Sequence, residues 1–195
     1  MVVAHHLIFT AYGCWLPNDP RGSCSNELRA DHLASLGEIH EGRKRVQPSS
    51  NVLRDFYRQA DELLAHTRQL FNDDDVSELA TCFAQILRNR TYTCYACAIM
   101  PDHVHMLIRR HRDKAEQMME HFLADTKTGL IAAERRPADH PVWGGPGWKV
   151  FLNTRAAIEN VVKYIKNNPI KIGRPEQRWD FVTEYDGWMP PLRLR

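Results

Sequence analysis

Hydrophobic and polar positions follow different periods along the chain, and these periods predict the order of its elements. Residues 2–12 form a β-branched and aromatic run that is typical of a strand, whereas residues 13–50 show no period and contain several prolines and glycines. Apolar residues then recur at helical spacing over residues 52–71. A second helix is predicted to begin at Asp75, because Asp75 and Glu78 have the spacing of a capping box ahead of another apolar stripe.

The second half of the chain predicts a hairpin followed by a helix, a strand and a last helix. Residues 91–100 are rich in Tyr, Thr, Cys and Ile, and Pro101 then occupies the second position of a turn that leads into another strand at His103. The other predicted elements are a helix at 114–133, a short strand at 148–152 and a helix at 154–168, which ends before Pro169.

This order of elements predicts an α+β fold with a ferredoxin-like (RRM-like) β-α-β-β-α-β antiparallel sheet and an added C-terminal helix. Two helices should cover one face of the sheet and leave the other face available. We expect residues 1–195 to form one domain, with residues 13–50 as a loop insertion after the first strand. Residues 170–195 form an aromatic tail that should dock on the body.

Two histidines lie two residues apart at the start of the strand after Pro101. Because side chains alternate along a strand, His103 and His105 share one face, while Val104, Met106 and Ile108 point to the other face and can pack in a core. Two imidazoles on one face form half of a metal site. The pair alone also fits two half-exposed histidines that hold no ligand, so its meaning depends on a third ligand.

The last predicted helix supplies such a ligand. Tyr164 and Asn168 lie four residues apart on the flank of its apolar stripe, so they can act together. An amide oxygen beside two imidazoles would give a mixed nitrogen and oxygen site that suits Mg²⁺ or Mn²⁺. Two ordinary interpretations stay open, in which Tyr164 is a tyrosine at the edge of the stripe and Asn168 caps the helix.

Two segments carry a family resemblance. They are Met100-Pro101-Asp102-His103-Val104-His105-Met106-Leu107 and Tyr164-Ile165-Lys166-Asn167-Asn168-Pro169. With them the chain resembles the HUH single-stranded DNA transposases, and in particular the branch of REP-associated tyrosine transposases. The segments 10–22 and 147–152 also look like that branch.

The resemblance implies a reaction and a set of roles. His103, His105 and Asn168 would bind a divalent metal, Mg²⁺ or Mn²⁺, and Tyr164 would be the nucleophile of a DNA transposase. Its attack on single-stranded DNA would give a 5′-phosphotyrosine and a free 3′-hydroxyl, without ATP. The implied partner is single-stranded DNA with hairpin ends, bound by a homodimer or a monomer. Many relatives outside this branch carry Gln where this chain has Asn168, which leaves the choice of metal open.

Charge adds candidate DNA contacts. The net charge of +2 neither requires nor excludes a nucleic acid, but basic residues surround the candidate site. The candidates for DNA binding are Arg21, Arg109, Lys149, Lys163 and Lys166. Charges of this kind also occur on ordinary solvated surfaces. The insertion at 13–50 is longer than a minimal domain requires, and we expect it to help recognise DNA.

Composition bears on the cellular location of the protein and on the redox state of its cysteines. No apolar run approaches the length of a membrane span, and the first residues lack a basic segment followed by a cleavage pattern, so we expect a cytoplasmic protein without a membrane partner. The five cysteines are irregularly spaced, which favours reduced, buried thiols. Cys94 and Cys97 should point to opposite faces of their strand.

Three further interpretations remain. A host-retained nickase would keep the same chemistry without moving its own gene. A non-catalytic ferredoxin-like module would bind single-stranded DNA or RNA through the open face, without metal or a covalent adduct. A replication or mobilisation nickase would normally carry additional domains.

Overall fold

The structure is a computed structural model that describes residues 1–23, 25, 27 and 31–191. Its centre is a four-stranded sheet in the order β2-β3-β1-β4, in which every neighbouring pair is antiparallel. This order confirms the predicted ferredoxin-like arrangement. The strands are β1 (Ala4–Thr10), β2 (Cys94–Ile99), β3 (His103–Arg109) and β4 (Trp148–Leu152).

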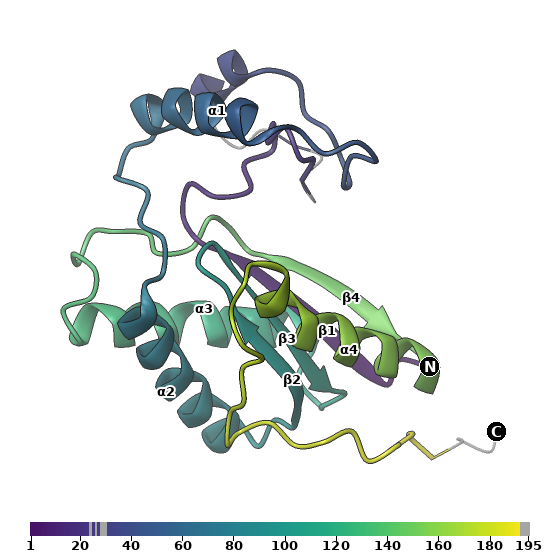
Figure 1. The fold of residues 1–195 in the computed structure, drawn as a ribbon. Coiled ribbons are helices and arrows are strands. Elements are labelled where there is room, and N and C mark those ends of the chain that lie inside the picture. Colours follow the sequence, from purple (N-terminus) through teal and green to yellow (C-terminus); the bar gives the residue numbers. More distant parts are fainter. Residues whose placement is uncertain (24, 26, 28–30, 192–195) are drawn as a thin grey trace.

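Two helices cover one face of the sheet, as predicted, and form the main core with it (Figure 1). They are α2 (Asp73–Arg90) and α3 (Ala115–Ala132). Alternation along β3 sends Val104, Met106 and Ile108 into this core, and all three are fully buried. The intervening side chains, including His105, therefore face the opposite side of the sheet.

That opposite face is not left open, which corrects the expectation from the sequence. The helix α4 (Arg155–Lys171) packs on β2 and β3 there, and Ile158 and Ile165 form a second core with Leu107. The reason is physical, because an apolar helical stripe has to be buried against something. Figure 1 shows α4 lying across the sheet on the side away from α3.

The aromatic tail docks on the body as predicted, as far as residue 191; residues 192–195 lie outside the described part. Gln177 makes two hydrogen bonds of 2.8 Å to the backbone of Ile99, and the Thr183 N–H donates to the Cys94 carbonyl at 2.8 Å. The tail therefore covers the edge of β2, where backbone groups would otherwise lack partners.

The insertion after β1 has more structure than the predicted loop. It contains a short 3-10 helix, η1 (Asp31–Leu36), and leads into α1 (Ser50–Leu63). Leu33 of η1 and Phe56 of α1 share a small separate core with Leu16. In Figure 1 this unit lies beyond the end of the sheet, over the start of β3. The helix ends at residue 63 and not at 71, because Phe71 packs in the main core instead of continuing the stripe.

Three local predictions were wrong, and two of them concern the ends of helices. The capping box of α2 is formed by Asn72 and Asp75, so the helix begins at Asp73. The last helix continues through Pro169 to residue 171, since the carbonyl of Pro169 accepts closing hydrogen bonds from Ile172 and Arg174.

Cys94 and Cys97 both face the main core, because a β-bulge between Cys94 and Ala96 shifts the alternation. Cys24 lies outside the described residues. The four other cysteines are buried and free, as expected.

None of the helices that the structure describes combines the length and the apolar character that a membrane-spanning helix needs.

The buried carboxylate of Asp75 yields a first prediction. It accepts hydrogen bonds from Arg136 at 3.1 Å and from Arg135 at 2.9 Å, and so ties the start of α2 to the segment after α3. Replacing it with alanine leaves the buried guanidinium of Arg136 without its carboxylate partner, so that only its hydrogen bond to the Arg135 carbonyl is kept. We expect Asp75→Ala to lower the free energy of unfolding by about 3–5 kcal/mol, measured by urea denaturation. Asp74→Ala, at an exposed neighbour, should change it by less than about 1 kcal/mol.

The same contacts give a pH dependence. Burial raises the pKa of Asp75, but the hydrogen bonds from Arg136 and Arg135 outweigh burial and hold this pKa below its usual value. A carboxylate of this kind stabilises the fold above its unfolded pKa, and its contribution is lost as the pH falls through the folded pKa. The stability difference between wild type and Asp75→Asn should therefore shrink below about pH 4. A constant difference from pH 7 to pH 3 would contradict this assignment.

Candidate active site

The turn between β2 and β3 and the start of β3 position the two histidines. The Met100 N–H donates to the His103 carbonyl at 2.8 Å and closes the turn that contains Pro101. The rings of His103 and His105 lie on one face of the sheet with their centroids 4.8 Å apart. The predicted shared face is therefore present in the folded chain.

Each of these imidazoles is held through its Nδ1 atom. His103 Nδ1 donates to the Asp102 carboxylate at 2.6 Å, and His105 Nδ1 lies 3.0 Å from Nε2 of His6 on the neighbouring strand β1. Within the described residues the Nε2 atoms of His103 and His105 make no hydrogen bond. Histidines that bind metals commonly show this pattern, in which one ring nitrogen is fixed by a neighbour and the other is free to coordinate.

The helix α4 brings Tyr164 to the same place. Its ring centroid lies 5.2 Å from that of His105 and 6.1 Å from that of His6, with edge-to-face geometry in both pairs. The side chain is 38% exposed, so its hydroxyl end can meet a substrate. Lys171, two turns further along α4, places Nζ 4.6 Å from the centroid of the Tyr164 ring. The tyrosine thus lies beside histidines of its own chain.

Asn168 lies one turn after Tyr164 and is buried. Its Nδ2 atom has no hydrogen-bond partner among the described residues. The helix continues to residue 171 and is capped at Ile172, so Asn168 is not the residue that caps it. A buried amide without a partner costs about 1–3 kcal/mol, and such a cost suggests that the group has a role in binding.

Electrostatics keep two histidines of this group neutral. Burial lowers the pKa of His6 to about 4. Burial also holds the pKa of His105 well below its usual value, and electrostatic repulsion from the neighbouring His103, His6 and Lys171 would oppose a positive charge on its ring. Neutral imidazole is the form that coordinates metals.

Asp102 is ionised in spite of its surroundings. Burial raises its pKa, but the hydrogen bond from His103 and the charges of His103 and Arg21 outweigh burial and leave the pKa below the usual value. Its carboxylate can therefore accept from His103 and face Arg21 at the same time.

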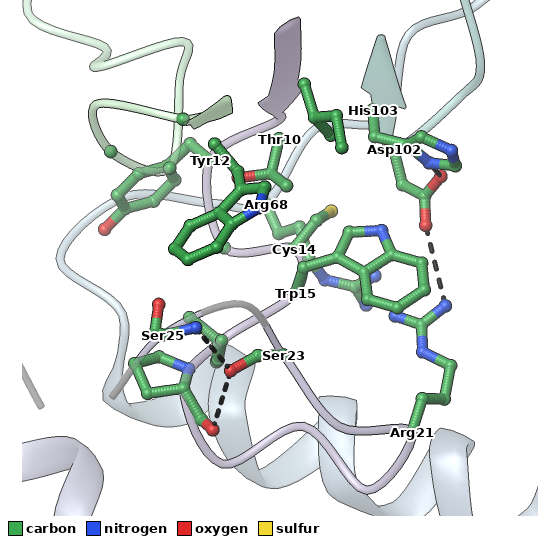
Figure 2. Close-up of a pocket in the computed structure, with 18 of the residues that line it drawn as sticks. Thr10, Tyr12, Cys14, Trp15, Arg21, Ser23, Ser25, Arg68, Asp102 and His103 are labelled. Atoms are coloured by element: carbon green, nitrogen blue, oxygen red, sulfur yellow. Dashed lines mark hydrogen bonds and ion pairs between the residues drawn. The ribbon is translucent and has the colours of Figure 1, made fainter. Parts of the chain in front are cut away.

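All four predicted site residues line one cavity of about 1900 Å³. The sheet and α4 form one side of it, and the insertion forms the other. Figure 2 shows Trp15 and Arg21 of the insertion close to Asp102 and His103.

The five candidate DNA contacts are distributed unevenly. Arg21 and Lys149 line the cavity, but Arg21 is paired with Asp19 and Asp102, and Lys149 lies 3.0 Å from Glu116. The other three do not line the cavity. They are Arg109, which lies 3.6 Å over the Trp188 ring, Lys166, which pairs with Glu176 at 3.6 Å, and Lys163, which is exposed on α4.

Sequence reasoning missed three residues of this site, namely His6, Asp102 as the partner of His103, and Lys171. His6 could have been found only from the pairing of β1 with β3, which places it diagonally across from His105. Lys171 was missed because the last helix was expected to end before Pro169.

A family model matches the part of the chain that carries the candidate site. The model described as "Transposase IS200 like" matches residues 63–168, which is more than half of the chain. The chain belongs to the IS200-like transposase family. The family predicted from the motifs at 100–107 and 164–169 is thereby confirmed. The matched region contains α2, β2, β3, α3, β4 and most of α4, whereas β1 and the insertion after it lie outside the matched region.

Solved structures show weaker likeness. One is the REP-associated tyrosine transposase bound to a REP hairpin, with 12% identity over 97% of this chain and 93% of that chain and a TM-score of 0.47. Another is described as a transposase of Deinococcus radiodurans R1, with 12% identity over 86% of this chain and 91% of that chain and a TM-score of 0.40. No curated protein matches the chain. The fold assignment of this IS200-like transposase rests on its own strand order and pairing.

Proposed function

We propose that this IS200-like transposase cuts and joins single-stranded DNA by metal-dependent transesterification, with Tyr164 as the nucleophile. One observation carries the proposal. The helix α4 places Tyr164 against His105, 5.2 Å between ring centroids, and brings the unpartnered amide of Asn168 into the same cavity as His103.

The proposed metal ligands are His103, His105 and Asn168. The donor set fits a divalent ion, because Nε2 of both histidines and the oxygen Oδ1 of the Asn168 amide make no hydrogen bond within the described residues. Mg²⁺ or Mn²⁺ bound there would polarise the scissile phosphate and help the departing oxygen to leave. Asp102 and His6 would hold the two imidazoles in the orientation that this role requires.

Tyr164 would supply the covalent step. Its hydroxyl oxygen forms a bond to phosphorus while the bond from phosphorus to the 3′ oxygen breaks, and the phenolic proton is balanced by protonation of that 3′ oxygen. The products are a 5′-phosphotyrosine and a 3′-hydroxyl. The same step in reverse joins a different 3′ end. Lys171, with Nζ 4.6 Å from the tyrosine ring centroid, would favour binding of the phosphate charge beside the nucleophile.

Single-stranded DNA with hairpin ends is the substrate that the family resemblance implies. The cavity supports an unpaired strand, because the half-exposed Trp148 lines it and can stack on a base. Since one chain carries all four proposed residues, we propose that cleavage does not need a residue from a second copy.

A covalent adduct tests the nucleophile. Purified protein would be incubated with labelled single-stranded hairpin DNA from the flanks of its gene and with Mn²⁺ or Mg²⁺, and denaturing gels would show any bound label. We expect Tyr164→Phe to reduce the adduct by more than about 100-fold, because it removes only the attacking oxygen. Tyr185→Phe is the matched control, since the Tyr185 hydroxyl donates to the Trp188 carbonyl outside the cavity.

Comparison of the two variants distinguishes covalent catalysis by Tyr164 from DNA binding without catalysis. An adduct that needs metal, persists in Tyr185→Phe and disappears in Tyr164→Phe supports the proposal. DNA binding without an adduct in either metal would contradict it and favour a non-catalytic module that binds single-stranded DNA or RNA.

Neighbouring asparagines test the third ligand. Asn168 is buried in the cavity, whereas Asn167 is exposed on the same helix. Asn168→Ala should weaken Mn²⁺ binding at least about tenfold, as measured by electron paramagnetic resonance of the free ion, while Asn167→Ala should not change it. Equal affinities in the two variants would remove Asn168 from the metal site.

A further inference from the structure

We propose that the insertion after β1 is a positioning element for the metal site, in which Arg21, held by Asp19 and Tyr57, fixes the carboxylate that orients His103. The inference rests on the metal-binding role proposed above for His103. It makes Arg21 a positioning residue, in place of the DNA contact expected from the sequence.

The first step is that Arg21 is itself held in one orientation. Its Nε donates to Asp19 Oδ1 at 3.0 Å, and a terminal nitrogen donates to Asp19 Oδ2 and to the Tyr57 hydroxyl, both at 2.7 Å. The Asp19 side chain is fully buried, and the Tyr57 hydroxyl donates to it. Tyr57 belongs to α1, so this helix fixes the guanidinium.

The second step leads from Arg21 to the site. The other terminal nitrogen of Arg21 lies 3.6 Å from Asp102 Oδ2, while Asp102 Oδ1 accepts from His103 Nδ1 at 2.6 Å (Figure 2). The backbone of Asp102 is also held, because its carbonyl accepts from the Ala11 N–H at 2.9 Å. Both carboxylate oxygens thus have a partner, and rotation of the carboxylate would cost one of them.

The third step is packing around the same ring. The guanidinium of Arg21 lies 3.6 Å from the centroid of the Trp15 ring, and Trp15 meets His103 edge to face at 5.7 Å. The backbone N–H of Trp15 donates to the Tyr57 hydroxyl at 3.1 Å. Trp15 therefore limits the tilt of the His103 ring, while Asp102 fixes its rotation.

These contacts leave Arg21 little capacity for DNA. Its planar face is covered by Trp15, Asp19 and Tyr57 accept from its nitrogens, and its side chain is only 18% exposed. A phosphate would have to displace the ion pair with Asp102. The residues of this clamp, Trp15, Asp19, Arg21 and Tyr57, lie outside the region matched by the family model, whereas Asp102 and His103 lie inside it.

Mn²⁺ affinity, read from the electron paramagnetic resonance of the free ion, tests the proposal without DNA. We expect Asp102→Asn to weaken binding by about 10–100-fold and Arg21→Gln by about tenfold. The double variant should be no weaker than Asp102→Asn alone, because both changes act through one carboxylate. Arg58→Gln is the matched control on α1, where the exposed side chain pairs with Asp55, and it should leave affinity unchanged.

Thermal melting would accompany each titration. If Arg21→Gln does not fold, Tyr57→Phe tests the same clamp, since it removes one hydroxyl and keeps the ring, and it should still weaken Mn²⁺ binding several-fold. Independent, additive losses in the double variant would overturn the proposal. So would unchanged Mn²⁺ affinity in a folded Arg21→Gln or Tyr57→Phe, with only DNA affinity reduced.

The proposed metal role is judged separately. Wild type should bind Mn²⁺, and His103→Ala should weaken that binding. If His103→Ala has no effect, the metal assignment and the clamp both fail. If His103→Ala weakens binding while Arg21→Gln and Asp102→Asn do not, the metal assignment stands and the clamp alone is overturned.

Discussion

The antiparallel pairing of β3 with β1 in the middle of the sheet is the constraint on which the site depends. This register sets Ile8 opposite His105 and brings His6, two pairs further along the ladder, within hydrogen-bonding distance of the His105 ring. A slip of one residue in β3 would turn its histidines into the core and its apolar residues onto the site. Burial of Val104, Met106 and Ile108 against α2 and α3 therefore fixes the face on which the histidines lie.

The arrangement on the face of the sheet that carries the histidines depends on the packing of α4. Ile158 and Ile165 pack α4 onto the sheet, and this contact sets the rotation of the helix about its axis. Tyr164 then lies against the ring of His105, and Asn168, one turn further along the same flank, lines the same cavity. A site built from a strand and a packed helix keeps its geometry better than one built from loops.

Local sequence patterns predicted those parts of the fold and of the candidate site that lie within a single helix or strand. Alternation at 103–108 and the spacing of Tyr164 and Asn168 were visible, because each lies within one element. Contacts between distant segments were not. His6 lies 99 residues from His105, and Tyr57 lies 36 residues from Arg21, so no short pattern could pair them. The bulge at Cys94 was missed because it depends on the pairing of β2 with the distant residues of β3. The continuation of α4 past Pro169 was missed because proline was taken as the end of the helix, whereas local backbone hydrogen bonds close the helix after it.

The energetics of the insertion favour a geometric role for its buried charges. Burial raises the pKa of Tyr57 and the charge of Asp19 adds to it, so the phenol stays protonated and donates. Removing Asp19 and Arg21 from water costs free energy that their attraction only partly offsets, so such a pair adds little to stability. The pair does hold the guanidinium of Arg21 beside Asp102. If the insertion served stability alone, apolar side chains could fill the same space at no cost in stability.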